Sequence, residues 1–133
     1  MRRFILTGLF GLLVPLAASA SSGTWSGYSV GGTLSVGHQT LTSRPLVAAL
    51  PATAELHHIA WRISLLSPPP PGLHIKLCSQ QRCLSLPALA GQRDDPAPLT
   101  AQGPFYFVYS VESRGALLPP LNVVKNQLTL NYR

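Results

Sequence analysis

Two cysteines, four acidic residues and four histidines carry most of the side-chain chemistry available to this 133-residue chain. Cys78 and Cys83 are separated by four residues, so they lack the C-x-x-C spacing of a redox pair. The chain also has no second cysteine pair that could complete a zinc site. We therefore predict a structural disulfide between Cys78 and Cys83, formed across a β-hairpin with a four-residue loop.

The side chains on both sides of the cysteines support this hairpin. Residues 73–86 alternate apolar and polar side chains before and after the predicted loop. If Cys78 lies opposite Cys83, then Leu77 faces Leu84. In each of the other opposed pairs, too, both members are assigned to the same face of the hairpin. A disulfide that closes so short a loop removes little chain entropy, so we expect it to contribute only about 2 kcal/mol to stability.

The remaining reactive side chains do not predict an enzyme. Three of the four carboxylates, Asp94, Asp95 and Glu112, fall in predicted loops or turns, where no facing carboxylate or base is expected. His57 and His58 point to opposite faces of one strand and so cannot share a metal ion from that strand. Motifs of serine hydrolases, zinc proteases, phosphate-binding loops and calcium loops are absent from the sequence. We predict no catalytic residues, no metal and no cofactor, and hence a binding or structural module.

The start of the chain predicts export from the cytoplasm. Met1-Arg2-Arg3 is positively charged, residues 4–17 are apolar without a charge, and Ala18-Ser19-Ala20 is a small-x-small cleavage signature. The apolar run is too short to span a bilayer as a helix. We therefore expect residues 1–20 to be a Sec-type signal peptide cleaved after Ala20. Residues 21–133 then form one domain with no membrane span.

Removal of Arg2 and Arg3 would leave eight of the ten Lys and Arg residues against four Asp and Glu, a net charge of +4. These charges are scattered singly and form no basic stripe, so the sequence argues against nucleic-acid binding. A mildly basic surface favours anionic partners such as cell-wall polymers or an acidic protein surface. As partner-binding residues we predict outward positions near the hairpin: Arg62, Lys76, Arg82 and the terminal Arg133.

Alternation of apolar side chains predicts the strands that form the core. Residues 56–66 place Trp61 and Ile63 on one face, and residues 105–111 are apolar almost throughout, as in a central strand. Between the first of these strands and the hairpin, the four prolines 68–71 predict a stiff connector. The predicted core includes Trp61, Ile63, Leu77, Leu84, Phe107 and Tyr109.

Two further segments contain turn signals. Residues 87–104 contain several prolines, glycines and adjacent aspartates, and we predict a long loop there. Near the C-terminus, a two-residue turn at Lys125-Asn126 would pair residues 121–124 with residues 127–132 and leave the last strand at a sheet edge. In total we expect seven to nine short strands and no helix after the signal. This pattern is typical of an antiparallel β-sandwich, with a small β-barrel as the runner-up.

The sequence also resembles the flagellar protein FlhE family of Gram-negative, enterobacterial-type flagellar systems. The similarity covers nearly all of residues 21–133 in order and spacing, and it is weakest across residues 38–54 and 88–103. The motifs that carry it are Ala60-Trp61-Arg62, Pro71-Gly72-Leu73, Leu77-Cys78-Ser79-Gln80, Arg82-Cys83, Leu118-Pro119, Leu121-Asn122-Val123 and the ending NQLTLNYR from Asn126 to Arg133.

The resemblance implies a small periplasmic protein associated with the flagellar type III export apparatus. Proposed roles of the family are to limit proton leakage through the export channel and to act as a chaperone against filament growth in the wrong compartment. Partners would be components of the export apparatus, rod, hook or filament, bound for example through the predicted edge strand, residues 127–132. The alternative is a carbohydrate-binding sandwich that holds peptidoglycan on exposed aromatic residues: Trp25, Tyr28 or Tyr106.

Overall fold

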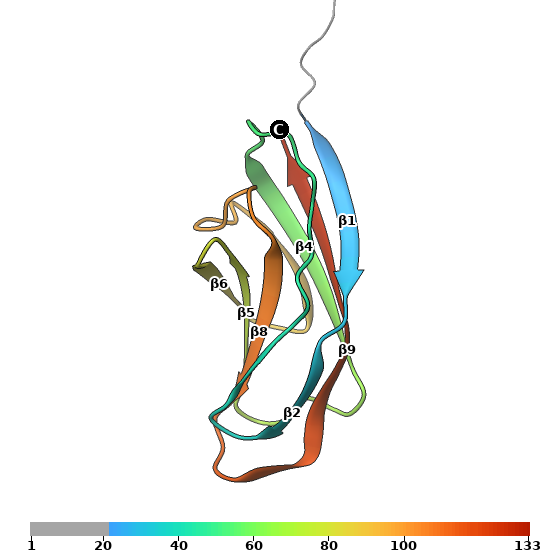
Figure 1. The fold of residues 1–133 in the computed structure, drawn as a ribbon, viewed down its shortest axis with the longest axis vertical. Helices are drawn as coiled ribbons and strands as arrows, with labels where there is room; N and C mark the ends of the chain where they lie inside the picture. Colours follow the sequence, from blue (N-terminus) through green and yellow to red (C-terminus); the bar gives the residue numbers. More distant parts are fainter. Residues whose placement is uncertain (1–21) are drawn as a thin grey trace, which may run out of the picture.

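The computed structural model describes residues 22–133, which form nine β-strands in two antiparallel sheets packed face to face (Figure 1). This arrangement confirms the predicted β-sandwich, rather than the barrel. Among the described residues no helix is long and apolar enough to cross a membrane. The predicted signal peptide and its cleavage site lie outside the described residues.

The first sheet contains five strands in the order β1-β9-β4-β7, with β2 paired to β9 beyond the end of β1. These strands are β1 (Gly23–Ser29), β2 (Gly32–Val36), β4 (Leu56–Leu65), β7 (Ala90–Asp94) and β9 (Ala116–Tyr132). The second sheet contains four strands in the order β3-β8-β5-β6. They are β3 (Thr40–Thr42), β5 (Leu73–Ser79), β6 (Arg82–Leu86) and β8 (Phe105–Val111).

The core lies between the two sheets, where alternate residues of each strand point inward. Trp61 is buried, and its indole N–H donates a hydrogen bond to the carbonyl oxygen of Ala88 at 2.9 Å, so its polar atom is satisfied. The structure buries all six residues that the sequence placed in the core: Trp61, Ile63, Leu77, Leu84, Phe107 and Tyr109.

The disulfide-closed hairpin is confirmed, with Cys78 opposite Cys83 and Leu77 opposite Leu84. The predicted four-residue loop is wrong, because Ser79 and Arg82 also pair and leave a two-residue turn. Gln80 and Gln81 form this turn with φ angles of 52° and 65°. Two successive left-handed residues give the turn a twist that matches the flanking strands, which allows pairing to continue to its base.

The predicted turn at Lys125-Asn126 is wrong, because β9 runs unbroken for 17 residues from Ala116 to Tyr132. Pairing with β4 shifts at this point: Ser64 lies opposite Lys125, whereas Leu65 lies opposite Val123. The extra residue, Val124, is a β-bulge. Inward-facing residues of β9 have odd numbers before the bulge and even numbers after it. A hairpin turn at Lys125-Asn126 would produce the same change, which is why the sequence pattern predicts one.

A continuous β9 also overturns the prediction that residues 127–132 form an edge strand. This segment pairs with β1 on one side and with β4 on the other, so it lies inside the first sheet (Figure 1). The edges of that sheet are β7 on one side and β1 with β2 on the other.

The predicted loop at residues 87–104 contains an ordered strand, β7, which pairs with β4. All five of its residues are exposed, so the segment lacks the apolar alternation from which a strand is predicted. Gly91 lies opposite Trp61, and a Cβ atom at that position would come within 2.8 Å of the indole ring. Close packing of the ring against the backbone of β7 therefore requires glycine there.

Candidate functional site

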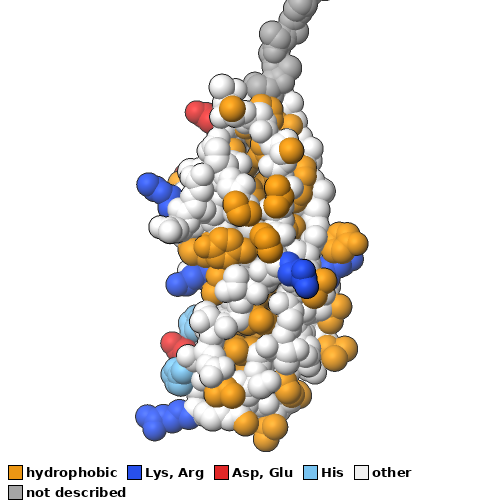
Figure 2. All heavy atoms as spheres, in the orientation of Figure 1, with side chains coloured by type: hydrophobic (Ala, Val, Ile, Leu, Met, Phe, Trp, Pro, Cys, Tyr) orange, Lys and Arg blue, Asp and Glu red, His pale blue; other side chains and the backbone are white. Residues whose placement is uncertain are grey.

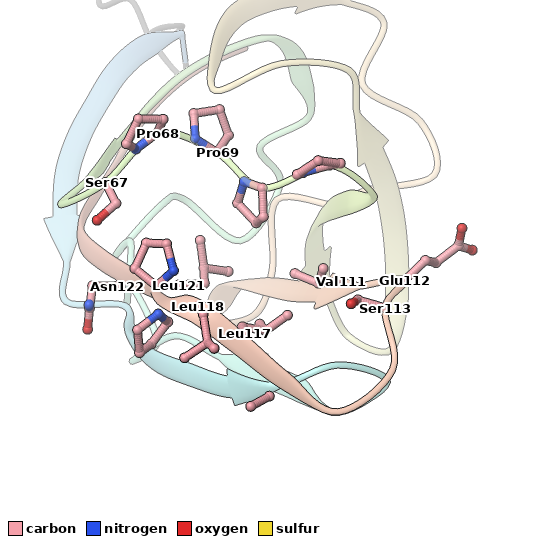
Figure 3. Close-up of a pocket in the computed structure, with 15 residues that line it drawn as sticks. Ser67, Pro68, Pro69, Val111, Glu112, Ser113, Leu117, Leu118, Leu121 and Asn122 are labelled. Carbon is pink, nitrogen blue, oxygen red and sulfur yellow. The ribbon is translucent and has the colours of Figure 1, made fainter.

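Two proline-rich segments that are distant in sequence meet at one end of the sandwich and enclose a cleft. One is the connector between β4 and β5, residues 67–71, and the other is the start of β9, residues 116–122. Residues 111–113, which follow β8, close one side. We call this feature the end cleft. In Figure 3, Pro68 and Pro69 lie across the opening from Leu117, Leu118 and Leu121.

The end cleft follows from the chemistry of proline. The four prolines of the connector have no backbone N–H and cannot join either sheet through the ladder, so the segment arches between its two anchor points. At one anchor, the amide of Leu66 donates to the carbonyl oxygen of Asn122 at 3.0 Å. At the other, the amide of Glu112 donates to the carbonyl oxygen of Gly72 at 2.9 Å. Both ends of the arch are thus held, and the prolines between them line the cleft.

The cleft has a volume of about 560 Å³ and is lined mainly by proline rings and leucine side chains. Leu118 on its wall is 89% exposed, and Leu66, which precedes the lining residue Ser67, is 71% exposed. Large apolar side chains held open to solvent around a concave apolar surface are typical of sites that bind another macromolecule or an apolar ligand. The cleft is therefore suited to an extended apolar segment, and its polar lining residues are Ser67, Glu112, Ser113 and Asn122.

The four partner-binding residues predicted from the sequence do not form one surface. Lys76 and Arg82 lie on the disulfide hairpin of the second sheet. Arg62 lies on the outer face of the first sheet, on the opposite side of the sandwich, since its neighbours Trp61 and Ile63 point into the core. Arg133 lies at the C-terminus, where its backbone pairs with Glu55. All four side chains are exposed, and on the face that Figure 2 shows, charged groups are scattered rather than gathered.

The three aromatic residues proposed for carbohydrate stacking differ in exposure. Trp25 is half-buried against the core, and Tyr106 is half-buried beside the disulfide strand β5. Tyr28 is 67% exposed on the outer face of the first sheet. Its ring centroid lies 5.0 Å from the ammonium nitrogen of Lys125, a cation–π contact. Only Tyr28 thus keeps the exposure that a stacking platform needs.

Two histidine–carboxylate pairs are visible only in the structure. His58 Nδ1 lies 2.6 Å from Asp94 Oδ1, and His74 Nε2 lies 3.4 Å from Glu112 Oε2. The sequence did not predict the first pair, because it depends on the unpredicted strand β7. Residues 22–133 contain no group of three potential metal ligands. The pairs join neighbouring strands or loops at the surface. Glu112 of the second pair also lines the end cleft, where it is the one carboxylate among the lining residues.

Comparison with known proteins adds to this description. A profile of the family described as flagellar protein FlhE matches residues 31–133. Over their full lengths, the chain is 38% identical to flagellar protein FlhE of Escherichia coli strain K12 and 37% identical to that of Salmonella typhimurium. A solved structure titled "Crystal Structure of FLHE" is 38% identical, with a TM-score of 0.78 over 86% of this chain and 99% of that one. The chain therefore belongs to the FlhE family of flagellar proteins.

Proposed function

We propose that this chain is a periplasmic accessory protein of the flagellar type III export and assembly system. In this proposal it binds a flagellar or export component, as a chaperone or plug that limits proton leakage and misplaced filament assembly. The observation that carries the proposal is the end cleft, with Leu118 and Leu66 held open to solvent beside it. Membership of the FlhE family supports a role associated with the flagellum.

The disulfide and the N-terminal sequence support the proposed location. Both cysteines of the chain are joined to each other, which favours an oxidising compartment such as the periplasm. The N-terminal pattern of Arg2-Arg3, an apolar run and Ala18-Ser19-Ala20 is that of a secretory signal.

In the proposed mechanism, the end cleft binds an extended apolar segment of a rod, hook or filament subunit. The prolines of the connector and Pro119-Pro120 of β9 supply no N–H groups, so side-chain packing rather than strand addition holds the segment. Covering an apolar segment in this way would keep the subunit from associating prematurely, which is the task of a chaperone.

The test is a pull-down of flagellar rod, hook and filament subunits by the oxidised protein, with Leu118→Asp and Leu66→Asp variants. We expect the wild type to capture a subunit, and each substitution to weaken capture by about tenfold or more, because a carboxylate would be placed against apolar surface. Val47→Asp is the matched control, since Val47 is 72% exposed, does not line the cleft and, unlike Leu66, is not next to a lining residue in sequence. Capture that persists in both leucine variants, or is lost equally in Val47→Asp, would remove the end cleft as the binding site.

A carbohydrate-binding function is the second candidate, and the exposed Tyr28 favours it. Peptidoglycan as a parallel bait in the same pull-down separates the two functions. Capture by peptidoglycan alone would make any flagellar role indirect.

A further inference from the structure

We propose that the outer face of the first sheet carries a second binding site, which takes a carboxylated polysaccharide. The site consists of Tyr28, Arg62, Lys125 and Gln127, here called the Tyr28 cluster, and a depression beside it. This inference rests on the carbohydrate-binding candidate given above, for which it names the ligand class. It does not depend on the proposed flagellar function, because the end cleft takes no part in it.

The pairing register of β1, β9 and β4 brings the residues of the Tyr28 cluster together. Gln127 of β9 lies opposite Tyr28 of β1 on one side and opposite Arg62 of β4 on the other. Directly opposed residues of antiparallel strands share a face, so these three side chains form a row on the outer surface. Lys125, two residues before Gln127 on the same face, brings its ammonium group to 5.0 Å from the Tyr28 ring centroid. An aromatic ring, an amide and two cations are thus gathered within three neighbouring strands.

The β-bulge at Val124 is what aims two of these side chains outward. Val123 points into the core, so an unbroken alternation would also turn Lys125 and Gln127 inward. The additional residue reverses the alternation and places both on the outer face. Bulges often re-aim side chains at binding sites, and this one delivers a cation and an amide to the row formed by Tyr28 and Arg62.

The cations of the cluster lack acidic partners. Within residues 22–133, both ion pairs join a histidine to a carboxylate, and no Lys or Arg takes part in one. Arg62 and Lys125 are diagonal neighbours across β4 and β9, a relationship that places residues about 7–8 Å apart. The two like charges share one outer face, and an anion bound to both would offset their mutual repulsion. The cluster is therefore complementary to a carboxylate.

The adjoining depression has the chemistry of a sugar site. Its volume is about 440 Å³, and it opens where Ala60, Ala90 and Gly91 provide little side chain. Gln92 and Thr129 line it together with Arg62 and Gln127 of the cluster, so amides and a hydroxyl face the space. Such groups pair with sugar hydroxyls, while the exposed ring of Tyr28 can cover the apolar face of a sugar. An acidic peptide would engage the two cations but would leave the depression and the ring unused.

The experiment titrates the oxidised protein with hyaluronan, a polymer of amino sugar alternating with a carboxylated sugar. Oligomers of chitin, which have the same amino sugar without the carboxylate, and polyglutamate are the two reference ligands. We expect hyaluronan to bind at low ionic strength. Binding should weaken by about tenfold or more in the double variant Arg62→Gln/Lys125→Gln and in Tyr28→Ala, whereas Tyr28→Phe should retain it. The matched control is Lys76→Gln/Arg82→Gln, which removes the same charge from the second sheet and should bind like the wild type.

Several results would overturn the proposal. These are absence of hyaluronan binding in the wild type, equal loss in the matched control, or equal affinity for chitin oligomers. Binding of polyglutamate that is insensitive to Tyr28→Ala would instead identify an acidic-peptide patch. The Leu118→Asp variant should bind hyaluronan normally, so failure of this site and failure of the end cleft are distinguishable.

Discussion

The Tyr109 hydroxyl donates a hydrogen bond to the side-chain oxygen of Asn126, which ties the second sheet to the first through the middle of the core. Both residues are fully buried. The amide nitrogen of Asn126 donates in turn to the backbone oxygen of Ser29 at 3.3 Å. The asparagine is therefore a buried polar junction between β1, β8 and β9, not a turn residue.

Substitution of Tyr109 by Phe should destabilise the protein by about 1–3 kcal/mol, because it leaves the buried oxygen of Asn126 without its donor. The double variant Tyr109→Phe/Asn126→Leu should cost less than the sum of the two single substitutions, since no half of the pair is left unsatisfied. Urea unfolding of all four proteins measures this coupling. Strict additivity would show that the pair contributes no coupling energy.

Stability should fall at alkaline pH, and Tyr109 should account for part of the fall. Burial raises the pKa of the Tyr109 phenol above its ordinary value of 10.0. Below pH 10 the phenol is protonated in both the folded and the unfolded state, so its contribution to the free energy of unfolding is fully present. Above that, the unfolded phenol loses its proton while the folded one keeps it, so the free energy of unfolding decreases by up to about 1.4 kcal/mol per pH unit. Unfolding of the wild type and Tyr109→Phe between pH 8 and about 12 tests this, and parallel curves would argue against it.

Substitution of Gly91 by Val should destabilise the protein by about 1–3 kcal/mol, because the new Cβ would meet the Trp61 indole in the core. Ala90→Val, on the exposed outer side of the same strand, is the control and should change little. Thermal unfolding followed by tryptophan fluorescence measures both variants. A stable Gly91→Val protein would mean that β7 can move away from Trp61 without loss of packing.

Charge reversal at Lys76 together with Arg82 should weaken the capture of a flagellar subunit without unfolding the domain. Both side chains are exposed on the disulfide hairpin, and neither has an acidic partner within residues 22–133. Circular dichroism verifies the fold, and the pull-down measures binding. Unchanged capture by the folded double variant would remove the hairpin as a contact surface.

Sequence patterns were sufficient to predict strands and their register where the alternation of apolar and polar side chains alone determines the structure. The hairpin register around Cys78 and Cys83 and the central strand β8 follow from the parity of neighbouring side chains. Strand β7 was missed because its exposed residues pair only through the backbone.

The sequence of β9 does not distinguish a hairpin from a continuous strand with a bulge. Both would explain why the inward-facing residues change from odd to even numbers near Lys125. In the structure Asn126 is buried and accepts a hydrogen bond from Tyr109, a partner on the other sheet that the local sequence does not reveal. The end cleft could not be predicted from the sequence either. Its walls come from proline-rich segments about 50 residues apart, and these meet only because the two sheets of the sandwich pack together.

The length of β9 has a consequence for how two ligands would be arranged. Leu118 at the end cleft and Lys125 in the Tyr28 cluster are on this same strand. At about 3.3 Å per residue, their backbones are separated by roughly 20 Å. A protein segment held at one site and a glycan held at the other would thus be kept at a set spacing by a single strand. In that arrangement the domain would act as an adaptor of fixed reach between a flagellar subunit and the surrounding cell wall.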